Sequence, residues 1–122
     1  MNKKTKGQME AEFTKAVIQF EKEYLGRGPM EGRTFILRDM ILVRLRGILS
    51  LAEQKLSENS DGRTLVKETR RQLFESSRPL LEKIVLDITG TNIVSLHTDM
   101  STKTGERIIV FTLASDLEAS FE

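Results

Sequence analysis

Residues 95–113, SLHTDMSTKTGERIIVFTL, contain the clearest pair of strands in this chain. Polar and apolar side chains alternate in the first part, which is typical of a strand with one buried face. The middle, residues 101–106, consists mainly of hydroxyl residues, lysine and glycine, and this composition favours a loop. Residues 107–113 are mostly β-branched and aromatic, so they predict the returning strand. The whole stretch indicates a hairpin with a polar tip, formed by strands at 92–98 and 107–113.

A second hairpin is predicted nearer the N-terminus, from strands at 33–38 and 41–48 that reverse at Asp39-Met40. The later of these strands has one apolar face and one face with two arginines: Ile41, Val43 and Leu45 against Leu42, Arg44 and Arg46. Alternate side chains point to opposite faces of a sheet. We therefore expect one face of this strand to be buried and the other to be partly exposed.

Three helices are predicted, over 5–24, 50–56 and 62–89. In the first, apolar residues recur at spacings of three and four, which places them on one helical face: Met9, Phe13, Ala16, Val17, Phe20 and Tyr24. The second begins with the capping-box spacing of Ser50 and Glu53. The third keeps its apolar phase across Pro79, which predicts one long helix with a bend there, because proline lacks a backbone amide.

The order of the elements, α-β-β-α-α-β-β, predicts an α+β fold: a four-stranded, mainly antiparallel sheet with helices on one face. The chain has 122 residues, the usual size of one domain, so we expect a single domain over 1–122. Apolar residues on the long helix cover more than one stripe, and either the first helix or a second copy of the chain has to bury them. We therefore expect a homodimer.

Composition argues against several classes of protein. With no cysteine, the chain forms neither disulfides nor thiolate metal sites, as is common in cytoplasmic proteins. Its 19 basic and 18 acidic residues give a net charge of +1, which argues against a nucleic-acid-binding protein. No apolar run approaches the ~20 residues of a membrane span, and the basic N-terminus lacks the apolar segment of a signal peptide. We expect a cytoplasmic protein that does not insert into a membrane and associates with one through a partner.

The candidate binding site consists of polar residues on the second strand and around the last hairpin: Arg44, Arg46, His97, Asp99, Ser101, Lys103 and Thr104. If the second and third strands are neighbours, the two guanidinium groups face the imidazole and the carboxylate across the sheet. Arginine side chains bind planar anions such as carboxylates, carbonate-like ions and phosphates. The alternative is a solvated sheet face with cross-strand charge pairs, each contributing less than ~1 kcal/mol.

Catalytic and metal-binding motifs are incomplete in this sequence. His97 and Asp99, two positions apart on a strand, can share a metal ion, but the chain has no second histidine and no cysteine to complete a zinc site. A nucleophile elbow of the G-x-S-x-G type is also missing. We therefore predict no catalytic residues, no metal and no cofactor, and a small enzyme is the third interpretation after the two given below.

Several short blocks together resemble the bacterial MpsC-like family: GRGP at 26–29, VRLRG at 43–47, GR at 62–63, VK at 66–67, RR at 70–71, RP at 78–79 and STKTGE at 101–106. The resemblance covers nearly the whole chain. One departure is Ser50-Leu51-Ala52-Glu53, where the family pattern is Thr-Pro-Ala-Glu. Serine still caps a helix, so only the first turn that proline would fix is lost.

The family name implies a link to a sodium-translocating system that generates a membrane potential. Related systems resemble transporters that supply inorganic carbon. The resemblance therefore implies a non-enzymatic, cytosolic accessory subunit of a sodium- or bicarbonate-linked transport system, with a membrane transport protein as its partner. It implies no catalytic residue. The residues themselves support a second hypothesis, a small anion- or ligand-binding module that uses the Arg/His sheet face.

Overall fold

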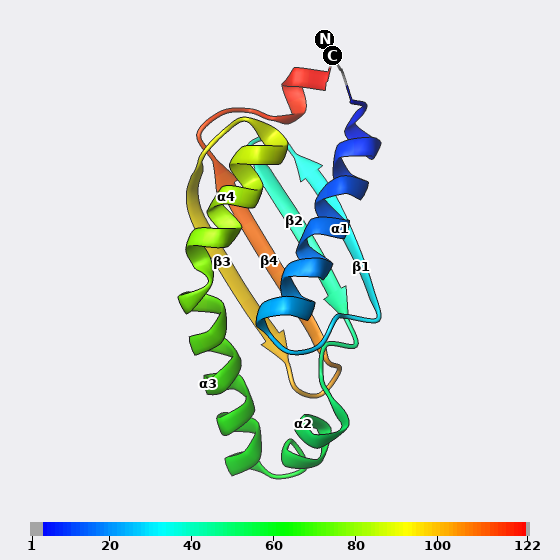
Figure 1. Cartoon of the computed structure of the whole chain (residues 1–122), viewed down its shortest axis with the longest axis vertical. Coiled ribbons are helices and arrows are strands. Elements are labelled where there is room, and N and C mark those ends of the chain that lie inside the picture. The colour runs from blue at the N-terminus through cyan, green and yellow to red at the C-terminus, as the bar shows by residue number, and fades with distance from the viewer. Residues whose placement is uncertain (1–3, 122) are drawn as a thin grey trace.

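A computed structural model describes residues 4–121 and shows helices packed on one face of a four-stranded sheet (Figure 1). The elements are α1 (Lys6–Tyr24), β1 (Glu31–Leu37), β2 (Met40–Arg46), α2 (Leu51–Leu56), α3 (Ser60–Ser76), α4 (Arg78–Thr89), β3 (Ile93–Ser101) and β4 (Glu106–Leu113), followed by a short 3-10 helix, Glu118–Phe121. The predicted α+β class, the order of elements and the antiparallel four-stranded sheet are confirmed. Residues 1–3 at the start of the basic N-terminus, and residue 122, lie outside the described part of the chain.

The strands lie in the order β1-β2-β4-β3, and every neighbouring pair is antiparallel. The last strand of the chain therefore lies between β2 and β3. The condition for the predicted Arg/His face, that the second and third strands are neighbours, is not met, because the two hairpins join through β2 and β4 instead. Strand order depends on pairing between segments that are distant in the sequence, and the local alternation of side chains does not specify it.

α1 begins at a capping box and buries one face against the sheet. The Thr5 hydroxyl accepts a hydrogen bond from the Gln8 amide at 3.1 Å, and the Gln8 side chain accepts one from the Thr5 amide at 2.8 Å. These bonds satisfy amides that a helix start leaves without partners. Phe13, Val17 and Phe20 are buried, as their helical spacing predicts.

The reversal between β1 and β2 lies at Arg38-Asp39, one residue earlier than predicted, since Leu37 pairs with Met40. Arg38 has a φ of 59°, which is the left-handed conformation that two-residue hairpin turns favour. Its amide donates to Glu118 at 2.9 Å, so the C-terminal 3-10 helix holds the turn. The described residues of the C-terminal tail are therefore tied to the sheet.

The helix predicted over 62–89 is divided into α3 and α4 at Ser77. Pro79 lies in the first turn of α4, where a helix does not need its missing amide. α3 begins earlier than predicted, because the Asn59 side chain accepts from the Gly62 amide at 2.8 Å and caps the helix. As a result α3 extends past the end of the sheet, while α4 packs beside α1 (Figure 1).

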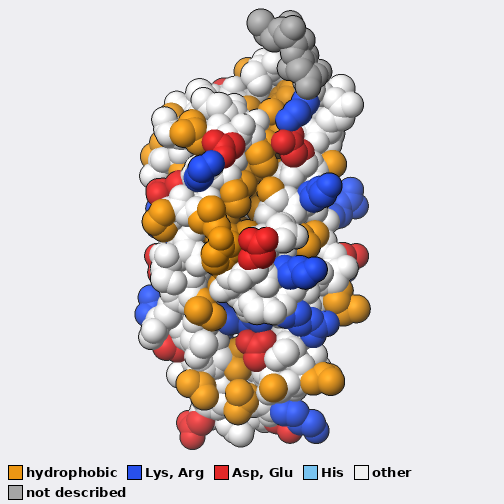
Figure 2. Space-filling view, viewed as in Figure 1, with side chains coloured by type: hydrophobic (Ala, Val, Ile, Leu, Met, Phe, Trp, Pro, Cys, Tyr) orange, Lys and Arg blue, Asp and Glu red, His pale blue; other side chains and the backbone are white. Residues whose placement is uncertain are grey.

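The core lies between the sheet and the helices α1 and α4. Alternate residues of β2 and β4 are buried in it: Ile41, Val43, Leu45, Ile109, Phe111 and Leu113. The predicted alternation of the second strand is thus confirmed. Hydrophobic side chains also gather in the strip between α1 and α4 (Figure 2). On α4, Leu80, Ile84 and Ile88 are partly buried against the core, so α1 covers part of the apolar surface that the long helix was expected to bury.

Candidate functional site

One face of the sheet is covered by helices, and the described residues leave the other face, here called the open face, uncovered (Figure 1). The register places one row of side chains across the four strands as Arg33, Arg44, Ile108 and Asp99. The next row consists of Phe35, Leu42, Val110 and His97. Phe35, Leu37 and Met40 expose 37%, 42% and 36% of their surface. The open face therefore has an arginine-rich part beside an apolar part.

Arg44 and Arg46 lie on the open face, and each has an acidic partner. The Nε atom of Arg44 is 2.5 Å from a carboxylate oxygen of Glu106, and Nη1 of Arg46 is 3.4 Å from Glu31. Thr104 lines the same shallow hollow as the two arginines. Exposed pairs of this kind contribute at most about 1 kcal/mol, which is the behaviour expected of a solvated sheet face.

His97 and Asp99 do not join the arginines, because β4 separates them from β2. His97 is paired with Val110 across the sheet. The Asp99 carboxylate accepts from the Met100 amide at 2.8 Å and lies 3.4 Å from Nζ of Lys67 on α3. The hydrogen bond from the Met100 amide and the charge of Lys67 hold the pKa of Asp99 below its usual value. Asp99 therefore belongs with α3.

The tip of the last hairpin forms a second small hollow. β3 continues to Ser101, beyond its predicted end, so the turn that follows is short. The Ser101 hydroxyl accepts from the Thr104 amide at 3.2 Å, and Gly105 has a φ of 72°. The hollow is lined by Gly47, Leu49, Gln54, Thr102, Lys103, Thr104 and Gly105. The seven predicted residues therefore do not form one site. Arg44, Arg46 and Thr104 share one hollow, and Lys103 and Thr104 share the other beside Ser101. His97 and Asp99 line neither hollow.

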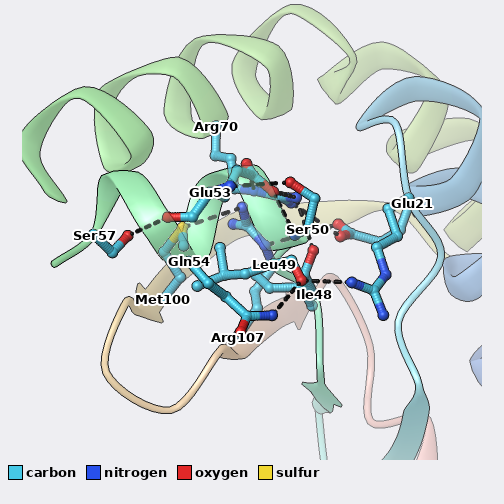
Figure 3. A network of polar contacts seen from close by, with 11 residues as sticks. Glu21, Ile48, Leu49, Ser50, Glu53, Gln54, Ser57, Arg70, Met100 and Arg107 are labelled. Atoms are coloured by element: carbon cyan, nitrogen blue, oxygen red, sulfur yellow. Dashed lines mark hydrogen bonds and ion pairs between the residues drawn. The ribbon is translucent and has the colours of Figure 1, made fainter. Parts of the chain in front are cut away.

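Three buried charged residues and the partly exposed Glu53 form a network that the sequence analysis missed, here called the buried network: Glu21, Glu53, Arg70 and Arg107 (Figure 3). They come from α1, α2, α3 and β4. Arg70 donates through Nε and Nη2 to the two carboxylate oxygens of Glu53 at 2.7 and 2.8 Å, and through Nη2 to the Ile48 carbonyl at 2.8 Å. This bidentate pair ties α3 to the start of α2.

Glu21 lies between the two arginines but makes no hydrogen bond to either. Its Oε1 is 4.0 Å from Nη1 of Arg70, its Oε2 is 3.7 Å from Nε of Arg107, and none of these four atoms has a hydrogen-bond partner. Burial raises the pKa of Glu21, although the two arginines oppose the shift. Burial likewise lowers the pKa of Arg107. Without hydrogen bonds, the ion pairs of Glu21 offset less of the cost of burying charge than the Glu53 pair does.

The sequence contains a signal for this network. Glu21 follows the buried Val17 by four residues, and Arg70 follows the buried Val66 by four, so both charges are in phase with the core side of their helices. Arg107 occupies one of the inward-facing positions of β4. A charge at a core position indicates a buried partner, because isolated charges are rarely buried. A helix with basic and acidic residues interleaved usually exposes them to solvent, but Arg70 is only 2% exposed.

A cleft of about 500 Å³, here called the α3–β3 cleft, lies between α3 and β3. α3 lines it with Lys67, Arg71 and Phe74, and β3 lines it with Thr98 and Met100. Arg107 of the buried network reaches its wall. The cleft therefore joins a buried charge to an apolar surface.

A metal site requires a cluster of ligating side chains, and a membrane span requires a long apolar helix. Within residues 4–121, no three side chains of His, Cys, Asp or Glu lie where they could hold a metal ion together. None of the helices described there has the length and apolar character needed to cross a bilayer.

The structure defines a small α+β protein whose antiparallel sheet is covered on one face and whose helices are joined by a buried ion network. The family described as "Na+-translocating membrane potential-generating system (MpsC)" matches residues 5–115. The chain belongs to this MpsC family, as the short sequence blocks predict.

Two proteins of Bacillus subtilis (strain 168) are similar to this chain. The one named "Uncharacterized protein YbcI" is 48% identical over 120 residues, which cover 98% of this chain and 97% of that protein. The one named "Uncharacterized protein YrhF" is 26% identical over 113 residues, which cover 91% of this chain and 92% of that protein. No solved structure gives a significant match.

Proposed function

We propose that this chain is a non-enzymatic accessory subunit of a Na+-translocating, membrane-potential-generating system, and that its open face binds a protein subunit of that system. The family description supports the link to such a system. We further propose that the chain is cytoplasmic and that the system it serves is linked to bicarbonate transport.

The composition of the open face is the observation that supports docking. Phe35 and the paired residues Leu37 and Met40 are exposed next to a row of arginines. Aromatic and arginine side chains are enriched at the energetic centres of protein interfaces, and exposed apolar patches often mark interaction sites. The arginines favour a partner surface with an apolar centre and carboxylates at its rim, because opposite charges at a rim guide association.

The test is co-purification of the tagged chain with the membrane subunits of a Na+-translocating system from the same organism. The tagged chain is expected to retain these subunits from mild detergent, whereas Phe35→Asp combined with Arg44→Glu is expected to release them. A matched control, Leu86→Asp with Lys83→Glu, changes exposed residues of the same types on α4 and is expected to keep the complex intact. Loss of the complex with both variants, or retention with both, would contradict docking through the open face.

The second candidate function is an anion- or ligand-binding module. The hollow formed by Arg44, Arg46 and Thr104 supports it, and the acidic partners of the two arginines weigh against it. A ligand that binds the native state raises its thermal stability by mass action. Bicarbonate, phosphate and small carboxylates, each as sodium and potassium salts, are to be compared on the wild type, Arg44→Ala and Arg46→Ala. If none of these anions raises the thermal stability of the wild type, the anion-binding function is contradicted.

A further inference from the structure

The α3–β3 cleft meets the open face only at Asp99, and it combines apolar walls with converging polar groups. Its volume of about 500 Å³ lies within the roughly 300–1,000 Å³ that is typical of pockets for small molecules. We propose that this cleft binds a small organic monocarboxylate that carries an apolar chain or ring.

Arg107 provides the group that recognises the carboxylate. Its side chain is only 3% exposed, yet it lines the cleft. Nη1 donates to the Thr98 hydroxyl at 3.0 Å, Nη2 contacts the sulfur of Met100 at 4.0 Å, and Nε faces Glu21 without a hydrogen bond. Sulfur is a weak acceptor, so most N–H donors of this guanidinium lack a strong partner. A carboxylate can accept two parallel hydrogen bonds from such a group.

Phe74 and Met100 provide the apolar wall of the same site. The guanidinium carbon of Arg107 lies 4.9 Å from the centre of the Phe74 ring. Phe74 and Met100 are almost fully buried, and both line the cleft. A ligand whose carboxylate contacts Arg107 therefore places its hydrocarbon part against an aromatic ring and a thioether, which are favourable apolar contacts.

The charges at the rim of the cleft favour a ligand with a single negative charge. Lys67 pairs with Asp99 at 3.4 Å, and Arg71 pairs with Glu68 at 2.7 Å. Glu75 adds another carboxylate to the lining. The two ion pairs are neutral overall, so Glu75 leaves the rim with a net charge of −1, and a doubly charged phosphate or dicarboxylate is repelled more than a monocarboxylate. Neutral ligands, in turn, leave the donors of Arg107 without an acceptor.

The test is a titration of the full chain with octanoate and, separately, with phenylacetate. ¹H–¹⁵N NMR spectra monitor each titration. We expect saturable shifts of the backbone amides of Phe74, Thr98 and Met100. Octanamide and phenylacetamide are expected to bind with an affinity lower by a factor of about ten or more, because the neutral amide group loses the charge-assisted hydrogen bonds. Inorganic phosphate is expected to leave these three amides unshifted.

Variants assign the binding to the cleft. Arg107→Lys keeps the charge but removes the planar group, and is expected to weaken octanoate binding about tenfold. Lys67→Met lies outside the buried network, so it tests the cleft even if Arg107→Lys fails to fold, and is expected to weaken binding about twofold to fivefold. Lys83→Met on α4 is the matched control and is expected to bind as the wild type does. Equal binding of acids and amides, or shifts confined to the open face, would overturn the proposal.

Discussion

Glu53 and Glu21 both face arginines, but their environments shift their pKa values in opposite directions. Burial raises the pKa of either carboxyl; at Glu53, hydrogen bonds from Arg70 and Ser50 outweigh burial and bring the pKa below 4.5. At Glu21 burial dominates, and the pKa lies above 4.5. The contribution of Glu53 to stability is therefore present above pH 4.5 and is lost as the pH falls through its lowered pKa. The contribution of Glu21 is complete below pH 4.5 and is lost as the pH rises through its raised pKa.

Replacing each carboxylate by its amide tests this difference. Glu53→Gln is expected to lower the free energy of unfolding near pH 7 by about 1–3 kcal/mol, because the buried Arg70 loses the charge of its hydrogen-bonded, partly exposed counter-ion. Glu21→Gln is expected to lower the free energy of unfolding by less. The stability of this variant relative to the wild type is expected to rise as the pH increases above 4.5, because only the wild type then has to ionise a buried carboxyl. Urea unfolding across this pH range measures both effects.

A surface control separates the loss of a buried pair from the loss of any charge. Glu82 on α4 is half exposed and lies 3.9 Å from Arg78, so Glu82→Gln is expected to change stability by less than about 1 kcal/mol. If Glu21→Gln costs more than Glu53→Gln near pH 7, the assignment of the stronger pair to Arg70 and Glu53 is wrong.

α2 and α3 are in close contact at Gly62. A Cβ atom at this position would lie 1.6 Å from the carbonyl oxygen of Leu56, so the two helices cannot keep their present distance with a larger residue. Gly62→Ala is expected to destabilise the chain by about 1–3 kcal/mol, the usual effect of overpacking. Gly7→Ala in α1 is the control: nothing lies within 4 Å of its Cβ position. It is expected to be neutral or stabilising by up to about 1 kcal/mol. Thermal unfolding of both variants measures this, and equal stability of the two would contradict the close contact.

Helices and strands were largely predictable from the sequence because local patterns specify them. The apolar spacing of α1 and the alternation of β2 each predict the observed element. The division between α3 and α4 was not predictable, because Pro79 fits either a bend within a helix or the first turn of a new one. The grouping of His97 with the arginines was not predictable for a different reason: whether His97 meets Arg44 depends on strand order, and β4 lies between them. The helical phase of Arg70 places it on the core side of α3. Its burial could be predicted only by also identifying the acidic partner that another element provides.

The association of two whole molecules depends on the apolar surface that the fold leaves exposed. α1 covers part of α4, but Leu65 and Leu73 on α3 remain 55% and 39% exposed. These two leucines lie on one row of residues spaced four apart, and their helical phase places them away from the α3–β3 cleft. We predict a homodimer in which the α3 helices of two copies pack along this row.

A homodimer of this 13.9 kDa chain is expected to show twice that mass by light scattering after gel filtration. Leu65→Lys with Leu73→Lys is expected to give the monomer mass, because the packed row would then carry like charges. Leu51→Lys, at a 78% exposed position of α2, is expected to keep the dimer. A wild-type chain that is monomeric at every concentration contradicts the prediction. Dissociation by Phe35→Asp instead of the α3 variant would place the two-fold interface on the open face, and the subunit proposed to dock there would then have to compete with a second copy of this chain.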